Sequence, residues 1–200
     1  MKNLIKIDDN FLSKKSKKFI NEVVLAPGIF PYYSARAHPY KTKENTYKKF
    51  MGHIILSRPD TELLELGEID KIDPTKAKTP AWNSPYHIQF IDMVNEFCEK
   101  QKIKIKKFYR MSVNCTYNNG HEATDIHTDH DFPHHQIIIY LNDAEDKNAE
   151  TVILNNKNKV IKRIKPIQYQ GICFKRLPHY LKFPKFGQRV ILIATFKNGK

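Results

Sequence analysis

Apolar residues near the start of the chain recur with the spacing of a helix. A helix is predicted to begin at Asp9 or Asn10, either of which can cap it, and to run to about Val24. Its apolar residues would be Phe11, Leu12, Phe19, Ile20 and Val23. Because these residues share one side of the helix, the segment is expected to pack against a core.

A second helical pattern follows a stretch without regular spacing. Residues 25–83 are interrupted by prolines and predict loops with short strands. The second helix is expected to begin near Ser84-Pro85, since serine can cap a helix and proline is favoured just after a cap. The residues on its apolar side would be Phe90, Ile91, Val94, Phe97 and Cys98. Their spacing indicates a helix that packs on a sheet.

Beyond residue 105 the pattern changes to short β-rich runs with turn residues between them. The runs are Met111–Tyr117, Gln136–Leu141, Thr151–Leu154, Lys159–Ile164, Gly171–Phe174 and Val190–Phe196. Many short strands at this spacing predict an antiparallel sandwich or jelly roll. The predicted fold class is therefore mostly β with flanking helices, and 200 residues are enough for one domain with a buried core.

Composition argues against a membrane protein and an exported protein. The hydrophobic fraction is 40%, and no run approaches the roughly 18 apolar residues of a membrane span, so no membrane partner is expected. The N-terminus has no apolar core of a secretory signal, and export is not expected. Cys98, Cys115 and Cys173 lie far apart and form no CxxC pair, so neither a disulfide framework nor a thiolate zinc site is indicated. A cytoplasmic location is predicted.

The net charge of +13 is unevenly distributed along the chain. Residues 111–150 carry eight acidic side chains and one lysine, whereas residues 151–200 carry twelve bases and no acid. A cation-binding segment is thus followed by a basic one. The basic half could steer a nucleic acid toward the protein, or its lysines could form an ordinary solvated surface.

The candidate chemistry begins with His127-Thr128-Asp129. On an extended backbone, residues i and i+2 point to the same face, so this imidazole and carboxylate could chelate one ion. His179 is expected to supply a third ligand from a loop before the last apolar strand. Two histidines and one carboxylate with open positions form the facial triad of non-haem Fe(II) sites. The alternative histidine ligands are His121, His130, His134 and His135.

Arg189 lies ten residues beyond His179, at the start of the last predicted strand. Its guanidinium could bind a carboxylate through two hydrogen bonds, so a dicarboxylate could reach the metal with one end and Arg189 with the other. Arg176, Lys182 or Lys185 could serve instead. A solvated strand end is the alternative role for Arg189.

His127-Thr128-Asp129, His179 and Arg189 together resemble the HxD…H…R pattern of the 2-oxoglutarate/Fe(II)-dependent oxygenases. The likeness is greatest to the prolyl-hydroxylase-like branch, including small versions from phages and marine bacteria, and it covers roughly residues 105–197. Tyr140 begins a Tyr-Leu-Asn motif, residues 140–142, that is typical of that branch. The resemblance implies that Tyr117 and Tyr140 contact the cosubstrate, although both could be core aromatic residues.

The resemblance implies a specific fold and chemistry. Residues 1–200 would form one oxygenase domain, in which a helical and loop part (1–104) packs on a double-stranded β-helix core (105–197). Its cofactors would be Fe(II), 2-oxoglutarate and O2, with ascorbate in support. His127, Asp129 and His179 would form the catalytic centre, and hydroxylation would be coupled to oxidative decarboxylation of 2-oxoglutarate. One departure is residues 146–150, which replace a Gly-Gly turn common in the branch.

Several substrates and roles stay open at the level of sequence. The resemblance favours a peptidyl proline or another protein side chain as substrate. A nucleic acid or a small metabolite is the alternative, the former because of the basic C-terminal half. Two further alternatives are a non-catalytic jelly-roll module that binds metal and a nucleic-acid-binding protein with structural zinc.

Overall fold

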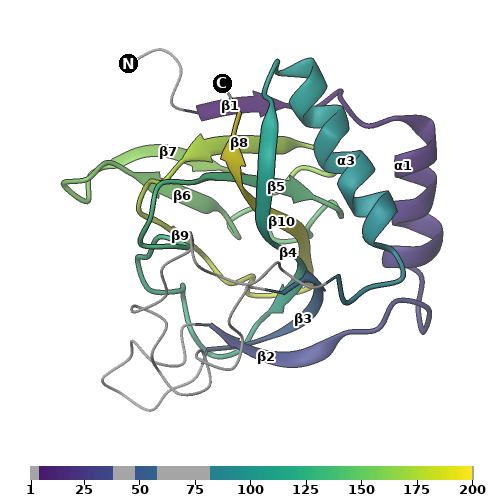
Figure 1. Cartoon of the computed structure of the whole chain (residues 1–200). Helices are drawn as coiled ribbons and strands as arrows, with labels where there is room; N and C mark the ends of the chain where they lie inside the picture. Colours follow the sequence, from purple (N-terminus) through teal and green to yellow (C-terminus); the bar gives the residue numbers. More distant parts are fainter. Residues whose placement is uncertain (1–4, 38–47, 58–81, 200) are drawn as a thin grey trace.

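Two antiparallel sheets form the body of the computed structural model, which describes residues 5–37, 48–57 and 82–199 (Figure 1). The larger sheet contains, in spatial order, β1 (Ile5–Asp8), β8 (Gly171–Lys175), β5 (His135–Tyr140), β10 (Gln188–Asn198), β4 (Ile105–Tyr117), β3 (Lys48–Leu56) and β2 (Tyr33–Ala37). The smaller sheet contains β7 (Val160–Ile164), β6 (Thr151–Leu154) and β9 (His179–Leu181). The predicted class, mostly β with flanking helices, is confirmed.

The first helix begins later than predicted. It comprises α1 (Lys14–Phe19) and a π-helical turn η1 (Ile20–Val24), and its cap is Ser13. The hydroxyl of Ser13 accepts a hydrogen bond from the amide of Ser16 at 3.2 Å, and Glu96 accepts one from the amide of Ser13 at 2.8 Å. The predicted caps Asp9 and Asn10 therefore lie in the segment that precedes the helix, because Ser13 has a tertiary partner that sequence spacing does not show.

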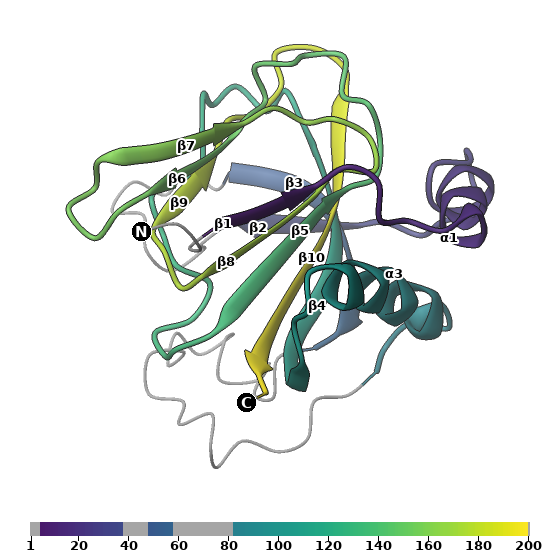
Figure 2. The same cartoon turned by 90° about the horizontal axis from the view of Figure 1, so that it is seen from above.

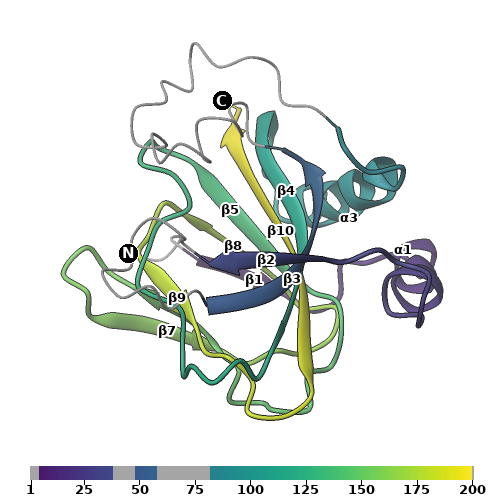
Figure 3. The ribbon, with the colours of Figure 1, turned by 90° about the horizontal axis from the view of Figure 1, so that it is seen from below.

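The second helix, α3 (His87–Lys100), follows the predicted Ser84-Pro85 start by two residues. The hydroxyl of Ser84 accepts a hydrogen bond from the amide of Tyr86 at 3.2 Å. Helices α1 and α3 lie on one side of the larger sheet, and the smaller sheet lies on its other side (Figure 2, Figure 3). No helix in the described ranges is long and apolar enough to cross a membrane.

The helix side of the larger sheet holds the main core. Its fully buried residues include Phe90, Val94, Phe97, Met111, Val113, Ile137, Ile139, Leu192 and Phe196. Packing leaves no room for a side chain at Gly171, where a Cβ atom would lie 2.6 Å from the ring of Phe97. A second cluster, which includes Ile138, Ile153, Ile172 and Ile191, lies on the opposite side of the sheet. Odd and even positions of the same strands thus enter different cores, as alternation requires.

The N-terminal half contributes more to the sheet than predicted. Within the region expected to form loops and short strands, β3 is nine residues long and pairs with β4. Its sequence contains Gly52 and His53 at its centre and lacks a clean alternation of apolar and polar residues, which is why it was hard to recognise. The remainder of that predicted region, residues 38–47 and 58–81, lies outside the described residues.

Candidate metal centre

His127, Asp129 and His179 meet between the two sheets. His127 lies in the long connection from β4 to β5, and His179 is the first residue of β9 rather than a loop residue as predicted. The two histidines form a β-bridge, in which each amide donates to the other residue's carbonyl at 3.0 and 2.9 Å. An extended backbone is expected at both His127 and Asp129. Of the two, only His127 lies in a β-bridge, and Asp129 lies in a bend. This bridge joins residues 52 positions apart.

The three side chains are close enough to share one ion. One ligand atom from each residue lies within 4.8 Å of the others. Nε2 of His179 is 3.5 Å from Oδ2 of Asp129, and the two imidazole centroids are 4.5 Å apart. Asp129 and His179 are buried. The donor set is two nitrogens and one oxygen, which suits a divalent transition metal with open coordination positions.

Backbone carbonyls orient both imidazoles. Nδ1 of His127 lies 2.8 Å from the carbonyl oxygen of Asp125, and Nδ1 of His179 lies 3.0 Å from that of Leu177. A carbonyl only accepts hydrogen bonds, so each Nδ1 carries a proton, and in the neutral ring Nε2 then carries the lone pair. Both rings therefore present the nitrogen that a metal would bind, held by the outer contacts that are usual for histidine ligands.

Asp129 is held by an arginine that the sequence interpretation missed. Nη1 of Arg110 donates to Oδ1 of Asp129 at 2.9 Å. Oδ2 is buried and has no hydrogen-bond partner within the described part of the chain. Burial alone would raise the pKa of Asp129, but Arg110 and the neighbouring histidines outweigh it and hold that pKa well below its usual range. The carboxylate is thus ionised, with one oxygen directed toward His179.

Arg110 belongs to a row of polar residues on β4, which the alternation of polar and apolar residues in the sequence indicates. Arg110, Ser112, Asn114 and Thr116 alternate with Tyr109, Met111, Val113 and Cys115. Gln136 was also missed, and its Nε2 lies 3.3 Å from Nε2 of His179. A polar residue at every second position of a buried strand marks the face that lines a site.

Arg189 is fully buried on the same face of the larger sheet. Its Nη1 donates to the carbonyl of Ala149 at 3.1 Å, while Nε and Nη2 have no hydrogen-bond partner among the described residues. Burial lowers the pKa of Arg189, an effect that the nearby Tyr140 opposes, yet a guanidinium stays charged in proteins. A buried cation with two donors lacking partners is costly, and such a group indicates a missing anion.

Tyr140 lies beside Arg189. The Cζ atom of Arg189 is 5.9 Å from the centre of the Tyr140 ring, and the Tyr140 hydroxyl donates to Oγ1 of Thr151 at 2.8 Å. Burial raises the pKa of Tyr140, so its phenol is neutral. A neutral phenol and a buried guanidinium next to each other form a suitable cradle for a carboxylate.

The structure places Tyr117 differently. It is the last residue of β4 and pairs with Gln188, whereas Thr116 pairs with Arg189. By alternation, its side chain leaves the strand on the face opposite to that of Arg189, so the register gives no support to its predicted contact with a cosubstrate. Of the two predicted tyrosines, the register thus places only Tyr140 on the face of Arg189.

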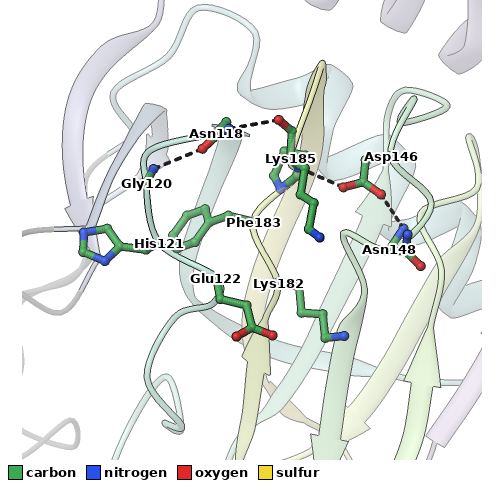
Figure 4. Close-up of a pocket in the computed structure, with 10 residues that line it drawn as sticks. Asn118, Gly120, His121, Glu122, Asp146, Asn148, Lys182, Phe183 and Lys185 are labelled. Atoms are coloured by element: carbon green, nitrogen blue, oxygen red, sulfur yellow. Dashed lines mark hydrogen bonds between the residues drawn. The ribbon is translucent and has the colours of Figure 1, made fainter.

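The alternative residues from the sequence are not part of the three-residue cluster, although His130 and His134 lie near Asp129. His130 and His134 belong to an aromatic cluster with Phe132, in which the His130 and Phe132 rings stack at 4.6 Å. His135 stacks on Phe196 at 5.6 Å. His121, Lys182 and Lys185 line a separate polar pocket of about 370 Å³ (Figure 4). The other residues that line it are Asn118, Gly120, Glu122, Asp146, Asn148, Phe183 and Pro184. This pocket contains none of the three candidate ligands.

Comparisons with known proteins agree with this architecture. No protein-family model matches the sequence, and no curated protein sequence matches it. Among solved structures, an oxidoreductase of the 2OG-Fe(II) oxygenase family from Burkholderia pseudomallei superposes with a TM-score of 0.71 at 12% identity, over 99% of this chain and 88% of that one. The chain has the jelly-roll fold of the 2-oxoglutarate/Fe(II) oxygenases. The predicted jelly roll is confirmed.

Two other structures with this oxygenase fold are prolyl hydroxylases. The enzyme from Trichoplax adhaerens, solved with a hypoxia-inducible-factor peptide, gives a TM-score of 0.59 at 18% identity, over 98% of this chain and 84% of that one. A viral collagen prolyl hydroxylase from Paramecium Bursaria Chlorella virus-1, solved with 2OG, gives 0.53 at 17% identity, over 97% and 96%. At these identities the likeness is one of fold.

Proposed function

We propose that the chain is an Fe(II)- and 2-oxoglutarate-dependent dioxygenase of the prolyl-hydroxylase-like type, with residues 1–200 acting as one domain. The observation that carries the proposal is the pairing of two incomplete polar sites on one buried face. At one, Oδ2 of Asp129 lies beside the two histidines without a hydrogen-bond donor among the described residues; at the other, Arg189 lacks an anion there. A metal and a dicarboxylate would complete both.

The residues have distinct roles in this proposal. Nε2 of His127, Nε2 of His179 and Oδ2 of Asp129 would hold the metal. Arg189 would bind the far carboxylate of 2-oxoglutarate, and the Tyr140 hydroxyl would lie alongside it. The bound iron, with 2-oxoglutarate and O2 and with ascorbate in support, supplies oxidative decarboxylation to succinate and CO2 coupled to hydroxylation of the substrate.

The burial of the site supports this chemistry. The isoleucines of the second core, among them Ile138 and Ile191, surround the polar groups on the same face of the sheet. A water-poor setting strengthens the attraction of Arg189 for a carboxylate. The carbonyls of Asp125 and Leu177 keep both imidazoles in one orientation. The chain would thus bind, orient and shield the reactants, while the difficult step belongs to the cofactor.

For the substrate, we favour a proline in a peptide. The support is the resemblance of the sequence to the prolyl-hydroxylase-like branch and the fold likeness to the Trichoplax enzyme, which was solved with a peptide fragment. Incubation of the Fe(II) protein with proline-containing peptides should increase succinate production and add one oxygen atom to a peptide, as measured by mass spectrometry. Succinate production that is stimulated by nucleic acid and not by peptides would instead indicate a nucleic-acid substrate.

The reaction type is tested by succinate formation. Protein reconstituted anaerobically with Fe(II) and 2-oxoglutarate should form succinate on exposure to O2, whereas His127→Ala should not. His121→Ala is the matched control, since His121 lines the separate pocket and should leave turnover unchanged. Equal succinate formation by wild type and His127→Ala would refute the assignment of the triad.

A further inference from the structure

Arg110 has an unusual place for a basic residue. It lies on the site-facing row of β4, opposite Thr195 of β10, and its side chain is 20% exposed. Nη1 donates to Oδ1 of Asp129 at 2.9 Å, and Nη2 lies 3.4 Å from the hydroxyl of Ser112. The guanidinium is thus anchored at two points and touches only one of the two oxygens of the candidate ligand.

We infer that Arg110 is a positioning residue that keeps Asp129 a ligand through one oxygen. With Oδ1 engaged by Arg110, only Oδ2 remains for the metal, and Oδ2 is the atom that lies 3.5 Å from Nε2 of His179. The inference rests on the proposed function, because it concerns how the chain holds the metal of that site.

The number of oxygens bound decides how many positions stay open. A carboxylate can bind a cation through one oxygen or through both. Two histidines and a one-oxygen carboxylate leave three positions of a six-coordinate ion, enough for a two-oxygen cosubstrate and for O2. If Asp129 bound through both oxygens, only two positions would remain, and the cosubstrate and O2 would compete. Arg110 would therefore protect the open positions.

Two simpler roles for Arg110 make different predictions. Arg110 could merely neutralise a buried carboxylate, in which case its loss would change folding stability and leave the coordination of bound metal unaltered. A purely electrostatic role would act on the affinity for the metal. A guanidinium close to a divalent cation repels it, so removal of Arg110 would only tighten metal binding. Metal affinity alone does not separate these roles from positioning, but two ligands that together need three open positions do.

The test uses Co(II) as the metal and two small probes. Oxalate occupies two positions and needs no contact with Arg189, whereas azide occupies one. In the Co(II)-loaded wild type, azide should bind as tightly with saturating oxalate as without it, because three positions are open. In Arg110→Met, where two positions would remain, saturating oxalate should weaken azide binding by about 10-fold to 100-fold, as followed by the Co(II) absorption spectrum. Arg110→Lys, which offers a single donor, should give an intermediate loss and carries the test if Arg110→Met does not fold.

The control variant is Arg163→Met. Arg163 also forms an ion pair, with Glu150 at 3.3 Å, but neither residue is a candidate ligand, so this variant should bind oxalate and azide together as the wild type does. If azide bound Arg110→Met equally well with and without oxalate, or if Arg110→Met only tightened Co(II) binding, the positioning role would be refuted. A wild-type protein that binds oxalate on Co(II) but not 2-oxoglutarate would instead refute the proposed function and leave the inference on Arg110 standing.

Discussion

The two faces of the larger sheet are buried equally well but by different kinds of residue. On β4, Met111 and Val113 face the helices, whereas Ser112 and Asn114 face the smaller sheet. The helix side is almost wholly apolar, while the other side also buries Arg189, Gln136 and Asp129. Burying polar groups without partners reduces stability, so the comparison indicates one face that stabilises the fold and another that serves a ligand.

The largest effect is expected on the helix side. Phe97 is fully buried, packs edge-on against Phe11 with centroids 5.0 Å apart, and touches the position of Gly171. Phe97→Ala should lower the free energy of unfolding by about 3 to 5 kcal/mol, as measured by chemical denaturation. The affinity of the remaining folded protein for 2-oxoglutarate should not change. A loss of affinity without a loss of stability would contradict the division between the faces.

Arg189→Met, on the face of the sheet toward the candidate metal centre, should weaken ligand binding without lowering stability. Loss of the fork should weaken 2-oxoglutarate binding to the metal-loaded protein by about 2 to 5 kcal/mol, measured by calorimetry. Because the side chain is a buried cation with two donors lacking partners in the described chain, the free energy of unfolding should rise by about 1 kcal/mol. Arg189→Lys keeps the charge without the fork and should also bind weakly. A protein destabilised by Arg189→Met, with intact binding, would show that Arg189 is structural.

Gly171→Ala tests the close packing on the helix side of the sheet with a single added methyl group. The added Cβ would lie 2.6 Å from Phe97 and 2.7 Å from Phe11, so a ring must move. The free energy of unfolding should fall by about 1 to 3 kcal/mol. Gly28→Ala offers no matched control, since Gly28 has a positive φ of 75°. Gly52→Ala is better suited, because its nearest neighbour would be 3.4 Å away, and it should cost less. Equal losses would rule out the crowding at Gly171.

The smallest effect concerns His53, a buried histidine outside the candidate metal centre. Burial lowers its pKa despite the hydrogen bond between Nδ1 and the carbonyl of Pro31 at 2.8 Å. The native state therefore binds this proton less readily than the unfolded chain does. Its contribution to stability is complete above the unfolded pKa of about 6.5 and is lost as the pH falls below that value. His53→Gln should flatten the fall in unfolding free energy over this range, and an unchanged slope would contradict the assignment.

Much of the β-rich half could be predicted from the sequence because its strands alternate or are wholly apolar. Thr151–Leu154 was predicted with its observed bounds, and four of the other five runs differ from a strand by at most two residues at either end. The fifth, Met111–Tyr117, covers only the last seven residues of β4. β9 could not be recognised, since His179–Leu181 is only three residues long and its existence depends on pairing with β6. β1 was hidden for a similar reason, because Ile5–Asp8 forms a strand only through β8.

The residues of the candidate site could be predicted from the sequence where the residue type itself indicates metal binding. They could not be predicted where the role depends on contacts that only the fold creates. His127, Asp129 and His179 are the residue types of a metal site, and the structure brings them together, although the bound ion stays a prediction. Arg110 looked like one base among many, because its contact with Asp129 arises from a fold in which residue 110 and the bend at 129 meet. Register also removed support for Tyr117, since spacing alone does not show on which face a strand residue points.

The most direct test of the account is a crystal structure with Mn(II), an oxygen-stable stand-in for Fe(II), and 2-oxoglutarate. We expect Mn(II) on Nε2 of His127, Nε2 of His179 and Oδ2 of Asp129, with the far carboxylate of 2-oxoglutarate on the guanidinium of Arg189. Mn(II) on other residues, or a 2-oxoglutarate carboxylate that leaves Arg189 without an anion, would contradict the claim that this face of the sheet is built for a metal and a dicarboxylate.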